Sequence, residues 1–147
     1  MLAIMFALCG WGAPAQQIQF RFSHVDMSEG LSHNQVNCIL KDSLGFLWFG
    51  TLSGLDRYDG YGFRVFRSIR GDTTSLSDNY VTAINPLPGG KLWISTRSGN
   101  DIYDPATEHF DRNDTAYLHS LHLPAGNVTH VTRDKAGDYW FVYEGAG

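Results

Sequence analysis

Histidine is the residue in this sequence best suited to metal binding or acid–base chemistry, and it occurs six times. Two of these residues, His119 and His122, stand three positions apart, which on a helix would place both imidazoles on one face. Zinc would need a third ligand and neighbouring groups that orient the imidazoles, and the sequence indicates neither. We therefore expect His119 and His122 to be solvated residues of a loop that connects two structural units of the chain, and we expect no metal site and no cofactor.

Carboxylates are the second candidates for chemistry, because a glycosidase uses a pair of them roughly 5–9.5 Å apart. Two acidic pairs recur at a spacing of 45 residues, as scaffold residues do: Asp56 with Asp101, and Asp59 with Asp104. We expect Asp59 and Asp104 to brace turns, and we expect no catalytic residue in this chain. Cys38 lies in an apolar run and is expected to be a small buried side chain.

Composition limits the elements that can position these residues. The chain has 147 residues, 43% of them hydrophobic and 14% aromatic, with 16 glycines, which favours one domain of strands joined by tight turns. The net charge of −4 and the scattered Lys and Arg residues argue against a nucleic-acid partner.

The first fifteen residues differ from the rest of the chain. Residues 1–12 carry no charge, and Ala13-Pro14-Ala15 has the small-x-small pattern of a signal-peptidase site. The apolar stretch is too short for a transmembrane helix, so we expect a signal peptide over 1–15, a mature chain over 16–147 and no membrane span. The alternatives are a buried N-terminal strand or helix, or a lipoprotein anchored through Cys9. If the leader is removed, Cys38 is left without a disulfide partner.

An internal repeat is the strongest signal in the sequence. Leu31-Ser32-His33-Asn34-Gln35-Val36 aligns with Leu76-Ser77-Asp78-Asn79-Tyr80-Val81 at an offset of 45 residues. The same offset joins Trp48 to Trp93, and an offset of 47 joins Trp93 to Trp140. A period of about 40–50 residues is typical of a β-propeller or a solenoid.

The content of one period favours the propeller. Short apolar runs that predict strands alternate with turn residues in the first unit: Val36–Lys41, Phe46–Thr51, Leu55–Tyr58 and Phe63–Phe66. The second unit repeats them: Val81–Asn85, which Pro86 and Pro88 should end early, then Lys91–Ser95, Asp101–Tyr103 and a weak strand near Glu108–Phe110. No stretch has the 3.6-residue periodicity of a helical repeat.

The predicted fold class is therefore all-β: four-stranded antiparallel blades of an incomplete β-propeller, about two and a half blades long. The repeat units should cover residues 31–75, 76–123 and 124–147. We expect Trp48, Trp93 and Trp140 to fill the space between adjacent sheets, and Gly45, Gly90 and Gly137 to occupy turns with positive φ. Residues 17–23 should form an outer strand of another blade.

Three segments resemble the two-component regulator propeller repeat: Gly30-Leu31-Ser32-His33-Asn34-Gln35-Val36, Asp42-Ser43-Leu44-Gly45-Phe46-Leu47-Trp48-Phe49-Gly50-Thr51 and Gly54-Leu55-Asp56-Arg57-Tyr58-Asp59-Gly60. The resemblance spans about residues 20–140. The second unit departs from the family at Ser95, where glycine is usual, and at Asn100-Asp101. The third unit reads Phe141-Val142-Tyr143 where Ile-Gly-Thr would be expected.

This resemblance implies the N-terminal, periplasmic sensor part of a Bacteroidetes-type hybrid two-component system, truncated here. Such a parent would be anchored in the inner membrane as a homodimer, would bind an oligosaccharide through its complete propeller, and would control glycan-utilisation genes. This chain shows no kinase or receiver motif, so we expect it to have no enzymatic activity. The alternative is a fragment of an exported propeller enzyme of the lyase or glycosidase type.

The ligand should lie on one face of the blades. Let the strands of a blade be numbered outward from the central channel, with the first strand running from the top face of the propeller to the bottom face. The turn between strands two and three and the connection between blades then both lie on the top face. Polar and aromatic side chains gather there, and they are the predicted ligand-binding residues: His33, Asn34, Asn79, Tyr80 and Arg97. Asn34 and Asn79 occupy matching repeat positions and can also be explained as turn caps. Tyr80 and Arg97 have no repeat partner, because Gln35 and Leu52 stand at their places.

An open stack of blades should also be difficult to keep in solution. Repeat proteins bury their core through neighbouring repeats, and bare sheet edges promote aggregation. We therefore expect this chain to be poorly soluble or loosely folded when it is expressed alone.

Overall fold

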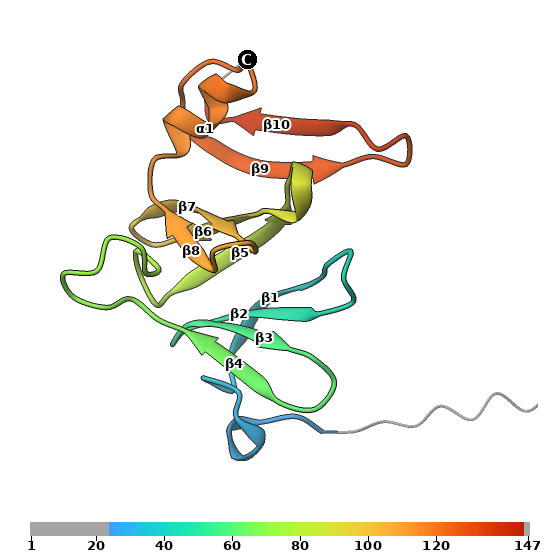
Figure 1. Ribbon diagram of the computed structural model, residues 1–147, viewed down its shortest axis with the longest axis vertical. Helices are drawn as coiled ribbons and strands as arrows, with labels where there is room; N and C mark the ends of the chain where they lie inside the picture. The colour runs from blue at the N-terminus through green and yellow to red at the C-terminus, as the bar shows by residue number, and fades with distance from the viewer. Residues whose placement is uncertain (1–23, 146–147) are drawn as a thin grey trace, which may run out of the picture.

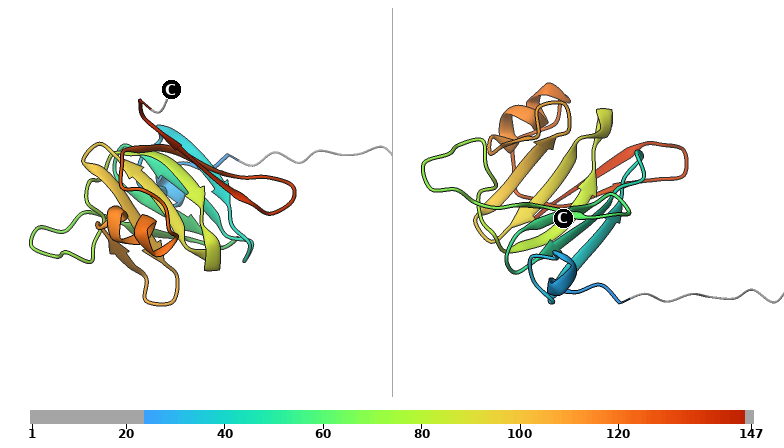
Figure 2. Two further views of the ribbon diagram at one scale, coloured as in Figure 1. Left: turned by 90° about the horizontal axis from the view of Figure 1, so that it is seen from above. Right: turned by 60° about the horizontal axis from the view of Figure 1, so that its bottom comes forward.

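The computed structural model describes residues 24–145, which form three antiparallel sheets stacked one upon another (Figure 1). The first two sheets have four strands each, in the orders β1-β2-β3-β4 and β5-β6-β7-β8, and the third pairs β9 with β10. The views from other sides show the sheets splayed like adjacent propeller blades, and residues 24–145 do not close a ring (Figure 2). The all-β prediction of incomplete four-stranded blades is confirmed. The predicted signal peptide and the strand over 17–23 lie outside the described residues.

The first blade forms as the sequence predicts. After a 3-10 turn, η1 (Met27–Glu29), its strands are β1 (Val36–Lys41), β2 (Leu47–Thr51), β3 (Leu55–Tyr58) and β4 (Phe63–Phe66). Alternate side chains face the second sheet, so one row of β2 and its partners is buried. At the β1–β2 turn, Gly45 has a φ of +94°, and Asp42 Oδ1 accepts the backbone N–H groups of Leu44 and Phe46.

The second blade repeats this plan with one correction. Its elements are β5 (Val81–Pro86), η2 (Pro88–Gly90), β6 (Leu92–Thr96), β7 (Gly99–Asp104) and β8 (His109–Asp111). The prolines were expected to end the first strand early, but Pro86 is the last residue of β5 and pairs with Leu92. Because β5 is an edge strand of its sheet, the missing proline N–H is tolerated there.

The third sheet consists of β9 (Val128–Arg133) and β10 (Tyr139–Tyr143), preceded by a short helix, α1 (Asp114–Ser120). The helix corrects the prediction of a loop around the two histidines. Asn113 caps it by accepting the N–H of Ala116, and Leu118 fixes it by inserting into the core. His119 and His122 are both solvent-exposed, as expected.

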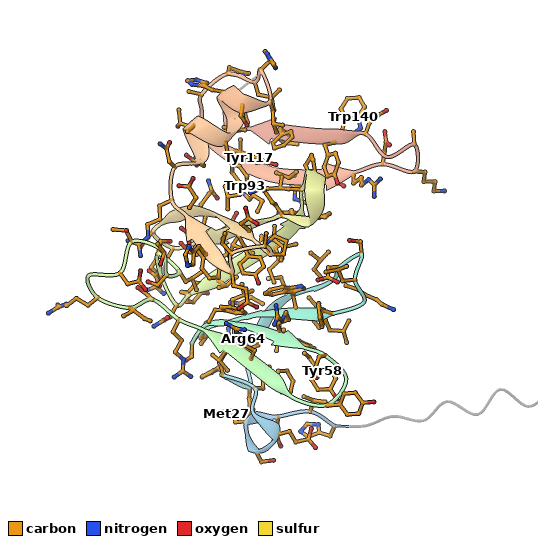
Figure 3. All side chains as sticks on the ribbon, viewed as in Figure 1. Met27, Tyr58, Arg64, Trp93, Tyr117 and Trp140 are labelled. Atoms are coloured by element: carbon orange, nitrogen blue, oxygen red, sulfur yellow. The ribbon has the colours of Figure 1, made fainter. Side chains whose placement is uncertain are left out.

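Large aromatic rings fill the spaces between the sheets. Trp48 is 1% exposed and lies edge-on to Tyr103 of the second sheet, with ring centroids 5.0 Å apart. Trp93 is fully buried and meets Phe141 of the third sheet in the same manner. Trp140 corrects the prediction: it is 60% exposed and points away from the stack (Figure 3), because no further described sheet covers it.

A compensation explains why the second blade tolerates Ser95 where the first has Gly50. Gly50 lies opposite Cys38 on β1, and a Cβ at position 50 would come within 2.6 Å of Val81 of the next blade. Ser95 lies opposite the smaller Ala83 and donates a hydrogen bond to Asn100. Cys38 is thus packed against the core, and burial raises the pKa of its thiol to about 11.

The connection between the first two blades is held mainly by the second. The guanidinium of Arg112, just after β8, donates to the backbone oxygens of Asp72, Ser75 and Leu76 at 3.0–3.3 Å. The N–H of Phe110 donates to the Thr74 carbonyl. On the other side, Arg67 donates to the Ser53 carbonyl of the first blade.

Candidate functional site at the connecting loops

A buried polar bridge joins each blade connection to the turn between the second and third strands of its blade. In the first blade, Ser32 donates its N–H and its hydroxyl to the carboxylate of Asp56, and its Oγ lies 2.7 Å from Thr51 Oγ1. Thr51 Oγ1 in turn bonds to Gly54 and Ser53 within the turn. These contacts bring the connection and the turn together, as the predicted top face requires.

The second blade contains the same bridge with one bond fewer. Ser77 donates its N–H to Asp101, and its Oγ lies 3.0 Å from Thr96 Oγ1. The Oδ1 atom of Asp101 is buried and has no hydrogen-bond partner among the described residues. Burial raises the pKa of both Asp56 and Asp101, so both carboxyls bind a proton more tightly than an exposed aspartate.

Tyr80 and Arg97 meet at this edge of the second blade. The Arg97 guanidinium lies over the Tyr80 ring, 4.5 Å from its centroid, and the backbone N–H of Arg97 donates to the backbone carbonyl of Tyr80 at 3.1 Å. The Arg97 side chain is exposed, and no carboxylate within residues 24–145 forms an ion pair with it. The pair therefore presents a positively charged guanidinium with five N–H donors, positioned over an aromatic ring.

The other three predicted residues make local contacts. The Asn34 side-chain oxygen accepts the N–H of Met27, and that of Asn79 accepts the N–H of Ser68. His33 Nδ1 accepts the N–H of Gln35. Both asparagines thus hold loop backbone, which is the role that the turn-cap alternative gives them, and no hydrogen bond among the described residues joins His33 or Asn34 to the Tyr80–Arg97 pair.

The carboxylates at the opposite ends of the strands hold turns. Asp59 accepts the N–H groups of Tyr61 and Gly62, and Asp104 accepts that of Ala106 and pairs with Lys91. These donors lower the pKa of both groups, led by the Gly62 N–H for Asp59 and by Lys91 for Asp104. Within residues 24–145 no cluster of three or more His, Cys, Asp or Glu side chains is arranged to hold a metal ion.

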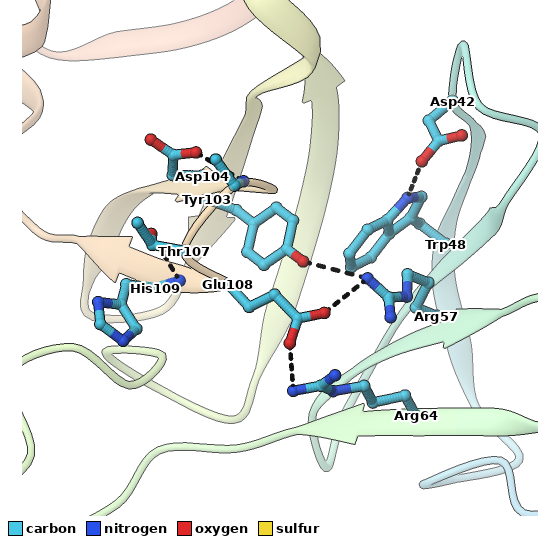
Figure 4. A network of polar contacts seen from close by, with 10 residues as sticks. Asp42, Trp48, Arg57, Arg64, Tyr103, Asp104, Thr107, Glu108 and His109 are labelled. Atoms are coloured by element: carbon cyan, nitrogen blue, oxygen red, sulfur yellow. Dashed lines mark hydrogen bonds and ion pairs between the residues drawn. The ribbon is translucent and has the colours of Figure 1, made fainter.

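A charged network that sequence reasoning missed ties the outer parts of the two blades together (Figure 4). Glu108 pairs with Arg57 at 3.1 Å and with Arg64 at 2.5 Å, and Arg57 also donates to the Tyr103 hydroxyl. Arg57 lies over the Phe46 ring, 4.9 Å from its centroid. Glu108 has a φ of +57°, which is uncommon for glutamate. Its role in joining the two blades is visible only in the folded structure, where it lies beside Arg57 and Arg64 of the first blade.

An open groove of about 850 Å³ lies beside β8 and the start of α1, and it was also not predicted. Lys91, His109, Arg112 and Tyr117 are among its lining residues, and none of the five predicted ligand residues is. Arg112 and Lys91 are already engaged there by the backbone of the blade connection and by Asp104. In the described part of the chain, no helix is both long and apolar enough to cross a membrane.

Comparison with known proteins agrees with the repeat and the fold. Residues 30–53 match the family model described as the two component regulator propeller. A stretch of 74 residues, half of this chain, is 36% identical to "Histidine kinase P4" of Formosa agariphila and covers 5% of that protein.

Two solved structures from B. thetaiotaomicron are similar over 81% of this chain. The extracellular domain of the hybrid two-component system BT3049 matches with a TM-score of 0.63 and 28% identity, and that of the one-component system BT4673 with 0.54 and 26%. This chain spans 17% of either structure. The resemblance found in the sequence is thereby confirmed: residues 30–53 match the two-component regulator propeller model, and the blades of this chain are similar to part of these extracellular domains.

Proposed function

We propose that this chain supplies non-catalytic blades of a periplasmic sensor propeller in a hybrid two-component system, and that Arg97, oriented by Tyr80, binds an acidic group of an oligosaccharide. In this proposal the remaining blades complete the propeller, and the membrane-anchored parent acts as a homodimer. The similarity to extracellular domains of two-component systems supports the sensor role. The exposed guanidinium stacked on Tyr80 is the observation that carries the ligand assignment.

The chemistry of the pair favours an anionic sugar. A guanidinium forms two parallel hydrogen bonds with a carboxylate or a sulfate, and the ring beneath Arg97 holds the fork in place before the ligand arrives. The arginine occupies one face of the tyrosine ring, so charge recognition by Arg97 is a better assignment than sugar stacking on that face of Tyr80. His33, Asn34 and Asn79 would shape the surrounding loops.

The test converts the loop of the second blade to that of the first. In the complete sensor, Arg97→Leu and Tyr80→Gln introduce the residue types found at the equivalent positions Leu52 and Gln35. Arg133→Leu is the matched control, because Arg133 also lies over a tyrosine ring, at 5.5 Å, but next to the β9–β10 turn. Calorimetry with neutral, uronate-containing and sulfated tetrasaccharides should show at least tenfold weaker binding of one anionic probe for Arg97→Leu and no change for the control. Equal affinities in all variants would remove this loop from the binding site.

A further inference from the structure

Two hydrogen bonds in the second blade join the blade connection to the turn that carries Arg97. The backbone N–H of Arg97 donates to the backbone carbonyl of Tyr80, and the Ser98 hydroxyl donates to Asp78 Oδ2 at 2.9 Å. The other oxygen of Asp78, Oδ1, accepts the backbone N–H of Tyr80 at 2.8 Å. One carboxylate therefore holds both Tyr80, which supplies the ring, and Ser98, which adjoins the residue that supplies the guanidinium.

The first blade lacks this clamp although it has the same scaffold beneath it. His33 stands at the repeat position of Asp78, and its Nδ1 accepts the backbone N–H of Gln35 at 2.9 Å, so the connection is capped in a similar way. The serine of the turn is retained as Ser53. Among residues 24–145, however, no hydrogen bond joins Ser53 to His33 or Leu52 to Gln35.

The chemistry of Asp78 explains why it can hold two loops at once. An ionised carboxylate accepts hydrogen bonds on both oxygens, whereas a neutral imidazole has one acceptor nitrogen, which His33 already uses for Gln35. Asp78 is half-buried, and within residues 24–145 it forms no ion pair with Arg97 or with another cation. The Arg97 guanidinium thus stays available to an anionic ligand.

We propose that Asp78 is the positioning residue of the Arg97 site, because it fixes the connection and the turn in the relative position that lets the guanidinium stack on Tyr80. This inference rests on the ligand role proposed above for Arg97. An arginine on an untethered turn loses more conformational freedom when it binds an anion, so fixing the turn in advance strengthens binding. Asp78, Tyr80, Arg97 and Ser98 then act as one unit, of which the first blade retains only the serine.

Substitutions of Asp78 separate positioning from charge. In the complete sensor, Asp78→Ala removes both bonds and should weaken binding of the uronate-containing or sulfated tetrasaccharide by roughly 5–10-fold. Asp78→Asn can keep both bonds, because its amide oxygen accepts the Tyr80 N–H and its NH₂ group donates to the Ser98 hydroxyl. It also removes a negative charge beside an anionic ligand, so it should bind at least as tightly as the unmodified sensor.

Asp59→Ala is the matched control for these affinities. It removes the same charge and a similar cap, since Asp59 accepts the N–H groups of Tyr61 and Gly62, but it does so at a turn on the opposite face. Its affinity for the tetrasaccharides should equal that of the unmodified sensor.

Crystal structures of the unliganded variants measure the position of Arg97 without a ligand. The guanidinium lies 4.5 Å from the Tyr80 ring centroid in the unmodified protein. In Asp78→Ala this distance should exceed the roughly 6 Å limit of a cation–π contact, and in Asp78→Asn the contact should be retained. Ser98→Ala removes only the bond to the turn and should displace Arg97 in the same direction, which keeps the test available if Asp78→Ala does not fold.

Two results would overturn the inference. One is a guanidinium that still stacks on Tyr80 in Asp78→Ala, and the other is an affinity of Asp78→Asn as low as that of Asp78→Ala. Failure of the proposed function would look different, because Arg97→Leu would then bind the tetrasaccharides as tightly as the unmodified sensor. The crystallographic distances would still decide the role of Asp78 in that case.

Discussion

The first and second blades share one scaffold and differ in the loop that this scaffold supports. Both hold their blade connection with a serine–threonine–aspartate bridge, Ser32–Thr51–Asp56 in one and Ser77–Thr96–Asp101 in the other. The loop of the second blade then presents Arg97 on Tyr80, where the first has Leu52 and Gln35. Residues common to both blades hold the fold, and an exposed difference between blades is where a specific interaction can arise.

The tryptophans allow the strongest test of what the blades share. Trp48→Ala and Trp93→Ala should each lower the free energy of unfolding by about 3–5 kcal/mol, because each removes a buried ring between two sheets. Trp140→Ala should cost less than about 1 kcal/mol, because that ring is exposed. Urea unfolding followed by circular dichroism measures all three. Equal losses at the three positions would contradict the difference in burial between Trp140 and the other two tryptophans.

Gly50 tests the size compensation between the blades. Gly50→Ala should destabilise the protein by about 1–3 kcal/mol, because the added methyl group meets Cys38 and Val81. Cys38→Ala together with Gly50→Ser reproduces the Ala83–Ser95 pair of the second blade and should recover part of that loss. Gly62→Ala is the control, since an added Cβ there has open space, and its unfolding curve should match that of the unmodified protein.

Asp101 has a buried oxygen without a hydrogen-bond partner among the described residues, whereas Asp56 uses both of its oxygens. We therefore expect the two bridges to contribute differently to the pH dependence of folding stability. Burial raises the pKa of Asp101 above its ordinary value of 3.8, so the folded state binds the proton more tightly than the unfolded state. The resulting contribution favours folding at low pH and is lost as the pH rises through the raised pKa. Asp101→Asn should remove this contribution, so the variant should gain stability relative to the unmodified protein as the pH increases from 4 to 7.

Asp56→Asn is the comparison that sharpens this prediction. Asp56 uses both oxygens, one for the Ser32 N–H and one for the Ser32 hydroxyl, and an amide NH₂ cannot accept the second bond. This variant should therefore be less stable than Asp101→Asn at every pH. Urea unfolding at four pH values measures both variants, and identical profiles would show that the missing bond of Asp101 has no energetic consequence.

The smallest expected effect belongs to the network between the blades. Glu108→Gln should lower the free energy of unfolding by about 0.5–1 kcal/mol at low ionic strength, because its partners are partly exposed. The loss should shrink in 1 M salt, which screens surface charges. Glu29→Gln, at an exposed position without an ion pair in the described structure, should have no effect in either buffer.

Sequence predicted the strands well because the repeat supplies two aligned copies of every signal. The runs around Trp48 and Trp93, and the turn glycines at 45 and 90, are each confirmed by their counterpart. The helix over 114–120 has no counterpart in the first unit, and seven residues are too few to show a clear period. Glu108 could not be predicted either, because its role depends on ion pairs with Arg57 and Arg64, which lie more than 40 positions away in the sequence.

The contact between Tyr80 and Arg97 was foreseeable from topology, because antiparallel succession brings their loops to one edge. The stacking of the guanidinium on the ring was not, since it depends on the path of the two loops. The exposure of Trp140 could not be deduced from its repeat position, because burial there comes from a neighbouring sheet and not from the residue itself.

The attachment of the blade connection to Arg112 has a consequence for how such arrays can change during evolution. The connection over residues 72–76 is hydrogen-bonded to Arg112 of the second blade, whereas Arg67 is hydrogen-bonded to Ser53 of the first blade. A segment running from Ser68 to Arg112 therefore carries its own tether and corresponds to about one repeat period. Genetic duplication or exchange with break points next to Arg67 would transfer a self-contained unit, whereas break points inside the connection would separate the loop from the arginine that anchors it.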